Sequence, residues 1–575
     1  MATEKKPTML TMTAGLRSHS GSWLNRIFHF HHGGRENNLA STKRLPKGTP
    51  RRAIENKKTP ARVPASERRP PPSVEPGTVS RPIGTLEMFF KRLGDVSASA
   101  DREHAAFFTA LQVRFPAEVT NPEAYIAKAW EAVGRRFPAL RAEISPPDEA
   151  DPDRRSRFTV RPFDAQSFRE SFSVHPDCPN VDALFAPASP IRATATCYWL
   201  PRPRQIVLRT AHWRADGFGQ VLLTDVFLST LGSILARGLD APLDVSLAPQ
   251  PEDAALTPGL EDLIRAHVRE EPAAAGDADV LMDTLVKGGK SIGLPTRPGS
   301  DGAAATTCAR AAVRLSAESS ARLAAACRAG GVSVTSALNA AIIRATARYP
   351  QDAGADAYVI FAPVDLRAPL IAAGAQACAA PTGTYVSGLP LRIEGVVAHD
   401  VAGGRSAPAK SFGALAAELS AFYSQDLLRY RRPGDDGAGA EPVSLLRLAE
   451  PYLERMTELF AGFPAPGCPY PKTPVISSLG KMDGLVKREY GAAAAGLRVD
   501  DFWVGIENAT PMITFHPWSW ADELTLSAAW NESFYSREIA VGALDKIMEE
   551  LGEGLGMEKV SYRIVSSCYD ESIQT

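Results

Sequence analysis

One short segment carries the residue types and spacing of an acid–base site, the six residues from His212 to Gly217 (His-Trp-Arg-Ala-Asp-Gly). A histidine ring titrates near neutral pH, so it can take a proton from a reacting group and give it back. Asp216 can cap a following helix by accepting hydrogen bonds from its first N–H groups, and Gly217 leaves room for close packing. The pattern, written HxxxDG, predicts that His212 is an acid–base residue. The alternative is a histidine hydrogen-bonded inside the core for packing.

The motif stands between a predicted strand and a predicted helix. The strand, at 205–211 (Gln-Ile-Val-Leu-Arg-Thr-Ala), is apolar and rich in β-branched residues, which is typical of a buried strand. The helix, at 219–238, has apolar residues at helical spacing. A histidine at the end of such a strand can project into a cavity, as a proton-transfer site requires.

Helices and strands are mixed along the rest of the chain. A stretch of low hydrophobicity at 239–305 separates two halves, each with strands and amphipathic helices. We therefore predict an α/β (α+β) fold of two lobes. The first lobe, with the motif and a crossover linker, covers 81–300, and the second covers 301–575.

The N-terminal 80 residues differ from the rest in composition. Residues 1–82 hold 16 Lys+Arg and 5 Asp+Glu, a balance of +11, whereas residues 83–575 hold 48 and 60, a balance of −12. A Pro- and Arg/Lys-rich segment with few aromatic residues cannot bury enough apolar surface to offset the entropy of ordering. We therefore predict a disordered tail at 1–80. Its segment 10–32 leaves two interpretations open, a mitochondrial targeting segment or an extension without such a role.

The composition of the whole chain excludes several classes of protein. With 575 residues, 44% hydrophobic and 22% charged, the chain is neither fibrous nor wholly disordered. A net charge of −1 gives no reason to expect a nucleic acid or an anionic membrane as partner, so a small-molecule ligand is favoured. Seven scattered cysteines without a CxxC, and His29, His31 and His32 without a neighbouring thiol or carboxylate, predict neither disulfides nor a bound metal. We expect a cytoplasmic monomer without a membrane-spanning helix.

The motif and several other segments resemble one superfamily, the CoA-dependent acyltransferases and peptide-synthetase condensation domains. The resemblance covers about residues 83–560. Three segments, in the expected order, look like the superfamily's RHxxLR segment, its strand ending in Arg and its GxFVNTLPLR-type segment: 135–144, 361–367 and 382–392. Three others are similar to fungal stand-alone O-acetyltransferases of the trichothecene type: 291–295, 475–485 and 524–535. The resemblance implies two chloramphenicol-acetyltransferase-like lobes with an active-site channel between them.

The resemblance also implies roles for the motif. His212 would deprotonate the acceptor for direct attack on a thioester and later protonate the thiolate. Asp216 would point away from the substrate and, with Gly217, fix the shape of the motif by holding an arginine. Arg367 is the first candidate for that arginine and Arg141 the second.

Two serines are candidates for stabilising the tetrahedral oxyanion. Ser477 and Ser478 lie in a segment that approaches the histidine in the superfamily. The alternative interpretation is that their hydroxyls close a turn before Gly480. Five further histidines stand in no motif and are interpreted as structural or surface residues: His104, His175, His267, His399 and His516.

Departures from the superfamily narrow the function. Ala211 precedes His212 where condensation domains have a second histidine, which favours an acyltransferase. We therefore expect an enzyme that moves an acyl group, most simply acetyl, from CoA to a hydroxyl of a secondary metabolite. Acetyl-CoA is a co-substrate, and no cofactor is permanently bound. Two alternatives stay open: a free-standing condensation enzyme with a carrier-protein-bound donor that forms an ester or amide, and a non-catalytic pair of lobes that binds a metabolite.

Overall fold

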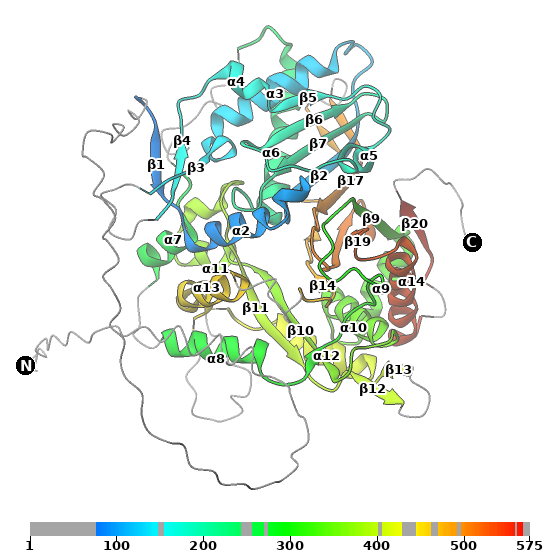
Figure 1. Ribbon diagram of the computed structural model, residues 1–575. Coiled ribbons are helices and arrows are strands. Elements are labelled where there is room, and N and C mark those ends of the chain that lie inside the picture. Colours follow the sequence, from blue (N-terminus) through cyan, green and yellow to red (C-terminus); the bar gives the residue numbers. More distant parts are fainter. Residues whose placement is uncertain are drawn as a thin grey trace, which may run out of the picture. The chain divides into compact units, whose positions relative to one another are not determined.

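The strand that precedes the histidine motif lies inside a six-stranded sheet. The computed structural model describes residues 76–147, 155–242, 256–268, 274–400, 405–427, 444–461, 470–491, 496–557 and 560–566. In this structure β7 (Gln205–Thr210) pairs antiparallel with β2 (Phe107–Arg114) and β6 (Thr196–Leu200). All of β7 beyond its first residue is buried, as its run of apolar and β-branched residues predicts. The sheet forms the centre of the first lobe, at the top of Figure 1.

The strand order of this first sheet is β16-β17-β2-β7-β6-β5. Its outer strands are β5 (Phe172–Val174), β16 (Glu489–Tyr490) and β17 (Leu497–Ile506). Two helices, α3 (Pro122–Arg136) and α6 (Gly217–Arg237), pack against each other, and α6 also contacts β2. Among the described residues α6 is the one helix that by itself is long and apolar enough to cross a membrane, and 61% of its apolar window is buried within the protein. The apolar composition of α6 is therefore explained by its burial, because a helix in the core of a protein is apolar on most of its faces.

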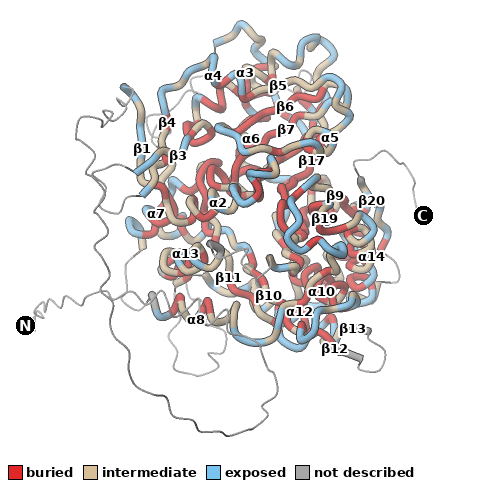
Figure 2. Tube along the Cα trace, in the orientation of Figure 1, coloured by how far each residue is buried: buried red, intermediate tan, exposed pale blue. Residues whose placement is uncertain are grey.

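A second sheet forms the other lobe, with strand order β14-β18-β19-β9-β20 and β15 beside β18. Its strands are β9 (Cys308–Leu315), β14 (Val475–Ile476), β15 (Gly480–Lys481), β18 (Thr514–Trp520), β19 (Glu523–Asn531) and β20 (Tyr562–Ser566). The helices of this lobe are α9 (Ala317–Ala329), α10 (Val334–Ala347), α12 (Phe412–Tyr423) and α14 (Arg537–Gly554). Buried residues of these strands and helices form one hydrophobic core, and Figure 2 shows buried segments at the centre of both lobes. The prediction of two mixed lobes is confirmed.

A smaller sheet extends the second lobe toward the histidine motif. Strands β10 (Ala355–Asp365) and β11 (Val386–Ile393) are antiparallel, and β8 (Lys290–Ser291) runs parallel to β10. The chain leaves β10 into α11 (Arg367–Ala372). Beside these strands α13 (Leu445–Ala461) contacts α2 (Thr85–Asp95), α7 (Leu260–His267) and α8 (Ala274–Val286). Smaller elements are α4 (Ala165–Arg169), α5 (Val181–Phe185), β1 (Val79–Pro82), β3 (Glu143–Ser145), β4 (Arg157–Val160), β12 (Val397–Asp400) and β13 (Arg405–Pro408).

The predicted boundaries need two corrections. Most of the tail predicted at 1–80 lies outside the described residues, but Val79 and Ser80 belong to β1, which pairs with β4. The division at residue 300 does not follow the sheets, because β16 and β17 come from the later part of the chain and complete the first sheet. The physical reason is the unpaired edge of β2, whose backbone groups are satisfied by β17.

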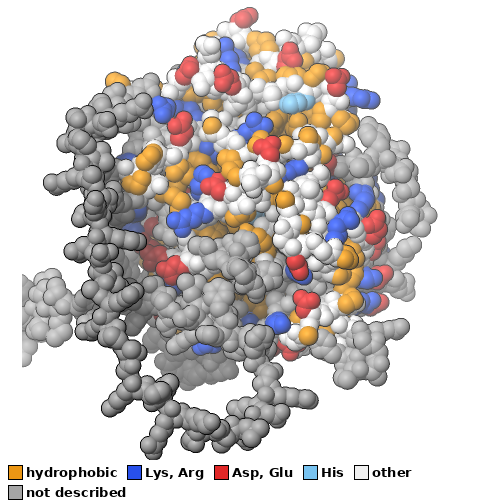
Figure 3. Space-filling view, in the orientation of Figure 1, with side chains coloured by type: hydrophobic (Ala, Val, Ile, Leu, Met, Phe, Trp, Pro, Cys, Tyr) orange, Lys and Arg blue, Asp and Glu red, His pale blue; other side chains and the backbone are white. Residues whose placement is uncertain are grey.

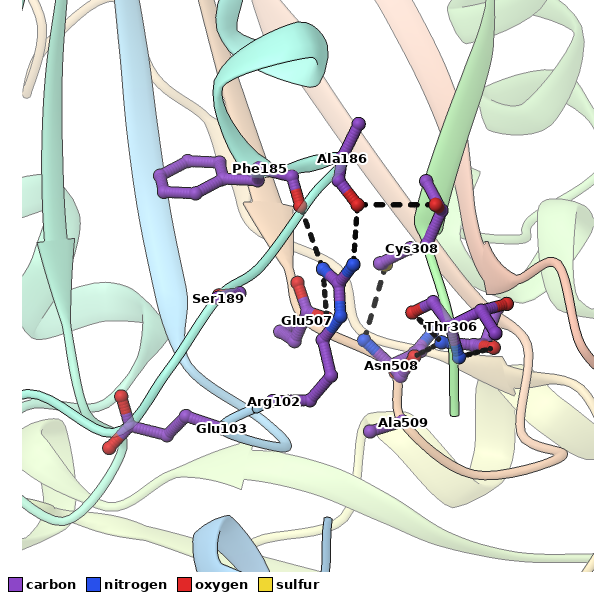
Figure 4. Close-up of polar contacts among 12 residues, drawn as sticks. Arg102, Glu103, Phe185, Ala186, Ser189, Thr306, Cys308, Glu507, Asn508 and Ala509 are labelled. Carbon is purple, nitrogen blue, oxygen red and sulfur yellow. Dashed lines mark hydrogen bonds and ion pairs between the residues drawn. The ribbon is translucent and has the colours of Figure 1, made fainter. Parts of the chain in front are cut away.

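The chain crosses from the first sheet to the second at Glu507 and Asn508. Arg102, in the loop before β2, donates to Glu507 Oε1 at 3.2 Å and to the carbonyl of Phe185 at 2.7 Å. The side chain of Asn508 donates to the carbonyl of Ala529, on β19, at 2.7 Å. Figure 4 shows Arg102 between Phe185 and Glu507, with Asn508 beside it. Buried polar groups of both lobes therefore fix this crossing point.

Candidate active site

His212 lies just beyond the end of β7, in contact with two phenylalanine rings. The ring of Phe90, on α2, stacks on the imidazole with centroids 3.5 Å apart and planes 5° apart. The ring of Phe107, at the start of β2, is 4.8 Å away and tilted by 54°. The hydroxyl of Thr384 donates to the backbone carbonyl of His212 at 3.0 Å. The imidazole is thus oriented by ring contacts and its backbone by a hydrogen bond from the second half of the chain.

Asp216 is the N-cap of α6 and uses both carboxylate oxygens. Oδ1 accepts a hydrogen bond from the N–H of Gly219 at 2.8 Å. Oδ2 accepts one from Nη1 of Arg367 at 2.8 Å and one from the N–H of Tyr385 at 2.7 Å. This carboxylate therefore ties the start of α6 to two segments of the second half.

The two arginines considered as partners of Asp216 occupy different places. Arg367 is buried and contacts Asp365 at 3.0 Å in addition to Asp216. Arg141 instead donates to the backbone carbonyl of Arg161. The structure brings Arg367 and Asp216 together and leaves Arg141 outside the pair.

The segment that follows α11 also holds the motif through its backbone. The N–H of Gly383 donates to the carbonyl of Arg214 at 2.7 Å, and Ala215 and Gly383 form a parallel β-bridge. The next two residues are Thr384 and Tyr385, which make the contacts described above. A stretch of the second half thus runs beside the motif along its whole length.

Two glycines at the start of α6 allow this close approach. A Cβ at Gly217 would lie 3.3 Å from Cζ of Phe107, a tight contact with a side chain. A Cβ at Gly219 would lie 2.6 Å from the carbonyl oxygen of Pro381, which is a backbone atom. The lack of a side chain at Gly217 therefore allows close packing, as the sequence predicts. The need for glycine is stricter at Gly219, which lies outside the motif, because a Cβ there would clash with a backbone atom.

Burial sets the protonation state of His212. It lowers the pKa of His212 to about 4, although the Asp216 carboxylate and the residue's own carbonyl act to raise it. The ring is therefore neutral at pH 7 and able to accept a proton. Burial likewise lowers the pKa of His104 to about 4, although a hydrogen bond with the backbone of Glu507 acts to raise it. His104 Nδ1 accepts a hydrogen bond from the N–H of Ala509 at 3.0 Å, which gives it a role in holding the crossing point.

The two candidate serines point to different places. Ser477 is half-buried, and its N–H donates to the carbonyl of Phe515, on β18, at 2.8 Å. Ser478 is exposed, and its hydroxyl is hydrogen-bonded to that of Thr335, on α10, at 2.9 Å. Gly480 has φ +73° and begins β15. Ser477 is thus the less exposed of the two, and Ser478 is turned toward α10.

The described residues offer no metal site. No group of three or more His, Cys, Asp or Glu side chains gathers there in a way that could hold an ion.

The ring contacts of His212 were not predictable from the motif. Phe90 and Phe107 lie more than 100 residues before His212 and belong to other elements, and nothing in their local sequence indicates the contact. A second buried histidine, His516, also lies near Phe107, with ring centroids 6.5 Å apart. Two adjacent phenylalanines on an amphipathic helix are a weak signal at best, since such pairs are common in cores.

We expect Phe90→Leu to lower kcat by up to about tenfold, with a smaller change in KM. The stacked ring fixes the plane of the imidazole, and an aromatic pair contributes about 0.5–1.5 kcal/mol beyond its buried area. Steady-state kinetics measure the effect, and Phe90→Tyr is the matched control because it keeps the ring. Equal kcat values for Phe90→Leu and the wild type would show that the stacking does not orient the His212 ring for any reaction.

The chain is similar in sequence to several known proteins. The family model of the phthiocerol/phthiodiolone dimycocerosyl transferase C-terminus matches residues 304–385. The loline biosynthesis cluster 1 transcription factor lolU1 of Epichloe uncinata is 28% identical over 84% of this chain and 96% of its own length. The acetyltransferase pigO of Monascus ruber is 24% identical over 84% of this chain and 98% of its own length.

Solved structures share the fold. The trichothecene 15-O-acetyltransferase TRI3 of Fusarium sporotrichioides aligns with a TM-score of 0.61 at 15% identity, over 82% of this chain and 94% of its own. The condensation domain of the monacolin K polyketide synthase MokA aligns with a TM-score of 0.53 at 13% identity, over 83% of this chain and 98% of its own. The likeness covers both lobes.

Proposed function

We propose, from the chain's similarity to acyltransferases and condensation domains, that it transfers an acyl group, most simply acetyl, from CoA to a hydroxyl of a secondary metabolite. One observation carries the proposal: a neutral histidine, stacked on Phe90, stands where the first sheet meets the Arg367 segment. Two relatives from the fungus Monascus ruber are named as acetyltransferases, and these names support the choice of acetyl.

In the proposed reaction His212 acts as the base. Its unprotonated ring nitrogen takes the proton of the acceptor hydroxyl, and the oxygen forms a bond to the thioester carbonyl carbon. The tetrahedral intermediate then breaks its C–S bond, and the imidazolium returns the proton to the thiolate. No acyl-enzyme forms. The Asp216–Arg367 pair keeps the motif in place and takes no part in proton transfer.

The oxyanion of that intermediate needs a hydrogen-bond donor. We assign this role to Ser477 before Ser478, because Ser477 lies half-buried beside β18 whereas the hydroxyl of Ser478 is engaged with Thr335 on an exposed edge.

The proposed ligands are small molecules. Figure 3 shows basic and acidic side chains interspersed over the described part of one face, without a patch of a single sign. Such a surface supports no long-range attraction for nucleic acid on that face.

Mass spectrometry of a fungal metabolite extract incubated with enzyme and acetyl-CoA tests the proposal. A metabolite that gains the mass of one acetyl group only when both are present supports it and identifies the acceptor. A product that forms only from an acylated carrier protein, with none from free acyl-CoA, would favour the free-standing condensation enzyme instead. The matched control is the His212→Ala variant.

The name of one relative favours a second candidate function. Because lolU1 is named as a transcription factor and not as an enzyme, the non-catalytic alternative stays open, a pair of lobes that binds a metabolite without converting it. Tight binding of a metabolite from the extract, with no acyl transfer from CoA or carrier protein, would support that function.

The pH dependence of kcat/KM on the acid side gives a further testable expectation. The base works only when unprotonated, and its pKa is about 4. We therefore expect kcat/KM to stay level as the pH falls from about 8 to about 5, and to decline tenfold per pH unit only below about 4. Circular dichroism at each pH controls for unfolding. A limb near the ordinary histidine pKa would show that His212 is solvated in the working enzyme.

A further inference from the structure

His516 faces the first lobe from the sheet of the second. Side chains alternate along β18, so Phe515 packs in the core of the second lobe, whereas Trp518 and Trp520 pack with residues of the first. His516 shares the face of these tryptophans. Its ring meets that of Phe107 edge-on, with centroids 6.5 Å apart and planes at 75°.

The imidazole of His516 is buried without hydrogen bonds. His516 is 1% exposed, and neither of its ring nitrogens has a hydrogen-bond partner among the described residues. Directly opposite on β19 is Ser527, also 1% exposed, whose hydroxyl has no partner in the described part of the chain either. An unpaired buried polar group costs about 1–3 kcal/mol, so two adjacent ones need an explanation.

Their position supplies that explanation. The Phe107 ring that meets His516 also contacts His212 and lies against Gly217. On the other side of β18, Ser477 donates its N–H to the carbonyl of Phe515, the residue before His516. His516 thus contacts the ring that touches the base, and its strand β18 runs beside a candidate oxyanion donor.

We propose that His516 and Ser527 form a polar subsite that binds a hydrogen-bonding group of a substrate lying between the lobes. The inference rests on the proposed acyl transfer. A neutral imidazole offers one hydrogen-bond donor and one acceptor. A hydroxyl or a secondary amide of the substrate also has one donor and at least one acceptor, so it can bond to both ring nitrogens. Burial lowers the pKa of His516 to about 4, so the ring is neutral at pH 7. Such a group occurs both in the amides of the pantetheine arm of CoA and in the hydroxyls of an acceptor.

The variant His516→Leu tests the subsite by opposing effects on stability and binding. Removing an unpaired imidazole removes its desolvation cost, so we expect Tm to equal or exceed that of the wild type. Loss of the hydrogen bonds to substrate should raise a KM by about tenfold, the size expected for one lost bond. A higher KM for acetyl-CoA assigns the subsite to the pantetheine amides, and a higher KM for the acceptor found in the extract assigns it to the acceptor.

The neighbouring residue Leu526 provides the matched control. It is fully buried on the opposite face of β19, in the core of the second lobe. Leu526→Ala should lower Tm and leave both KM values unchanged, the reverse of His516→Leu. Ser527→Ala, which adds no bulk, should raise the same KM as His516→Leu by a smaller factor.

The outcomes separate the subsite from the proposed function. Unchanged KM values in both His516→Leu and Ser527→Ala, with an active wild type, would overturn the subsite alone. A marked fall in Tm or a failure to fold in His516→Leu would also overturn it, because the ring would then be a structural residue. If the wild type itself transfers no acyl group, the proposed function fails and the subsite fails with it.

Discussion

Replacing His212 with alanine is expected to lower kcat/KM for acyl transfer by about 10²- to 10⁴-fold, the usual contribution of a general base. The residue is neutral at pH 7 because burial lowers its pKa to about 4, so the wild-type ring is ready to accept the acceptor's proton. Steady-state kinetics with acetyl-CoA and the acceptor identified in the extract measure the loss. The fold should persist, because the backbone of the motif is held by Thr384, Asp216 and Gly383 rather than by the ring.

A second histidine provides the control for this variant. His175 is half-buried in the first lobe, and its Nε2 is hydrogen-bonded to the hydroxyl of Ser173 at 3.0 Å. His175→Ala removes the same side chain without touching the motif and should keep nearly full activity. Near-normal turnover in His212→Ala, with an intact circular dichroism spectrum, would contradict the mechanism.

Replacing Arg367 with alanine is expected to have the largest effect on stability. The Arg367 and Asp216 side chains are only 5% and 3% exposed, and their ion pair spans 2.8 Å. Removing one member of a buried pair leaves an uncompensated charge and costs about 3–5 kcal/mol. The loss of unfolding free energy should lie near the lower end of this range, because Asp216 still accepts hydrogen bonds from the N–H groups of Gly219 and Tyr385. Denaturant unfolding measures the loss, and activity should fall with it as the motif loosens.

A double-mutant cycle with Asp216→Asn isolates the pair. If the two side chains stabilise the fold through each other, the double variant should lose clearly less than the sum of the two single losses. Arg114→Ala is the surface control, since its pair with Asp500 involves an arginine that is 58% exposed. Such exposed pairs contribute about 0–1 kcal/mol. A loss in Arg367→Ala no greater than that in Arg114→Ala would show that the buried pair does not hold the motif.

The part of the site that depends on local sequence was predictable. A buried strand, a histidine and a helix-capping aspartate lie within a dozen residues, and each has a propensity that the sequence shows directly. The pairing of Asp216 with Arg367 spans 151 residues and was expected only through the resemblance to a superfamily. The resemblance ranked Arg367 before Arg141, and in the fold Arg367 begins α11 beside the motif whereas Arg141 lies near Arg161.

Other features depend on tertiary contacts that no local pattern encodes. No local pattern says which sheet the strand at Leu497–Ile506 joins, and the structure pairs it with β2. Phe90 has the same apolar character whether it fills a core or stacks on an imidazole. His516 has no motif around it, and its lack of partners among the described residues becomes visible only once the lobes are assembled.

The crossing of β17 into the first sheet has a consequence for how the protein is made. Leu111 on β2 pairs with Phe502 on β17, so the nascent chain must be extended almost to its end before this sheet is complete. Contacts of such long sequence separation form slowly, because the cost of closing the intervening loop comes before any contact is gained. During translation β2 therefore presents an open edge, the kind of surface that pairs with other chains and that chaperones cover. A truncated product that stops before β17 would keep that edge permanently and is expected to aggregate, even though it contains the whole HxxxDG motif.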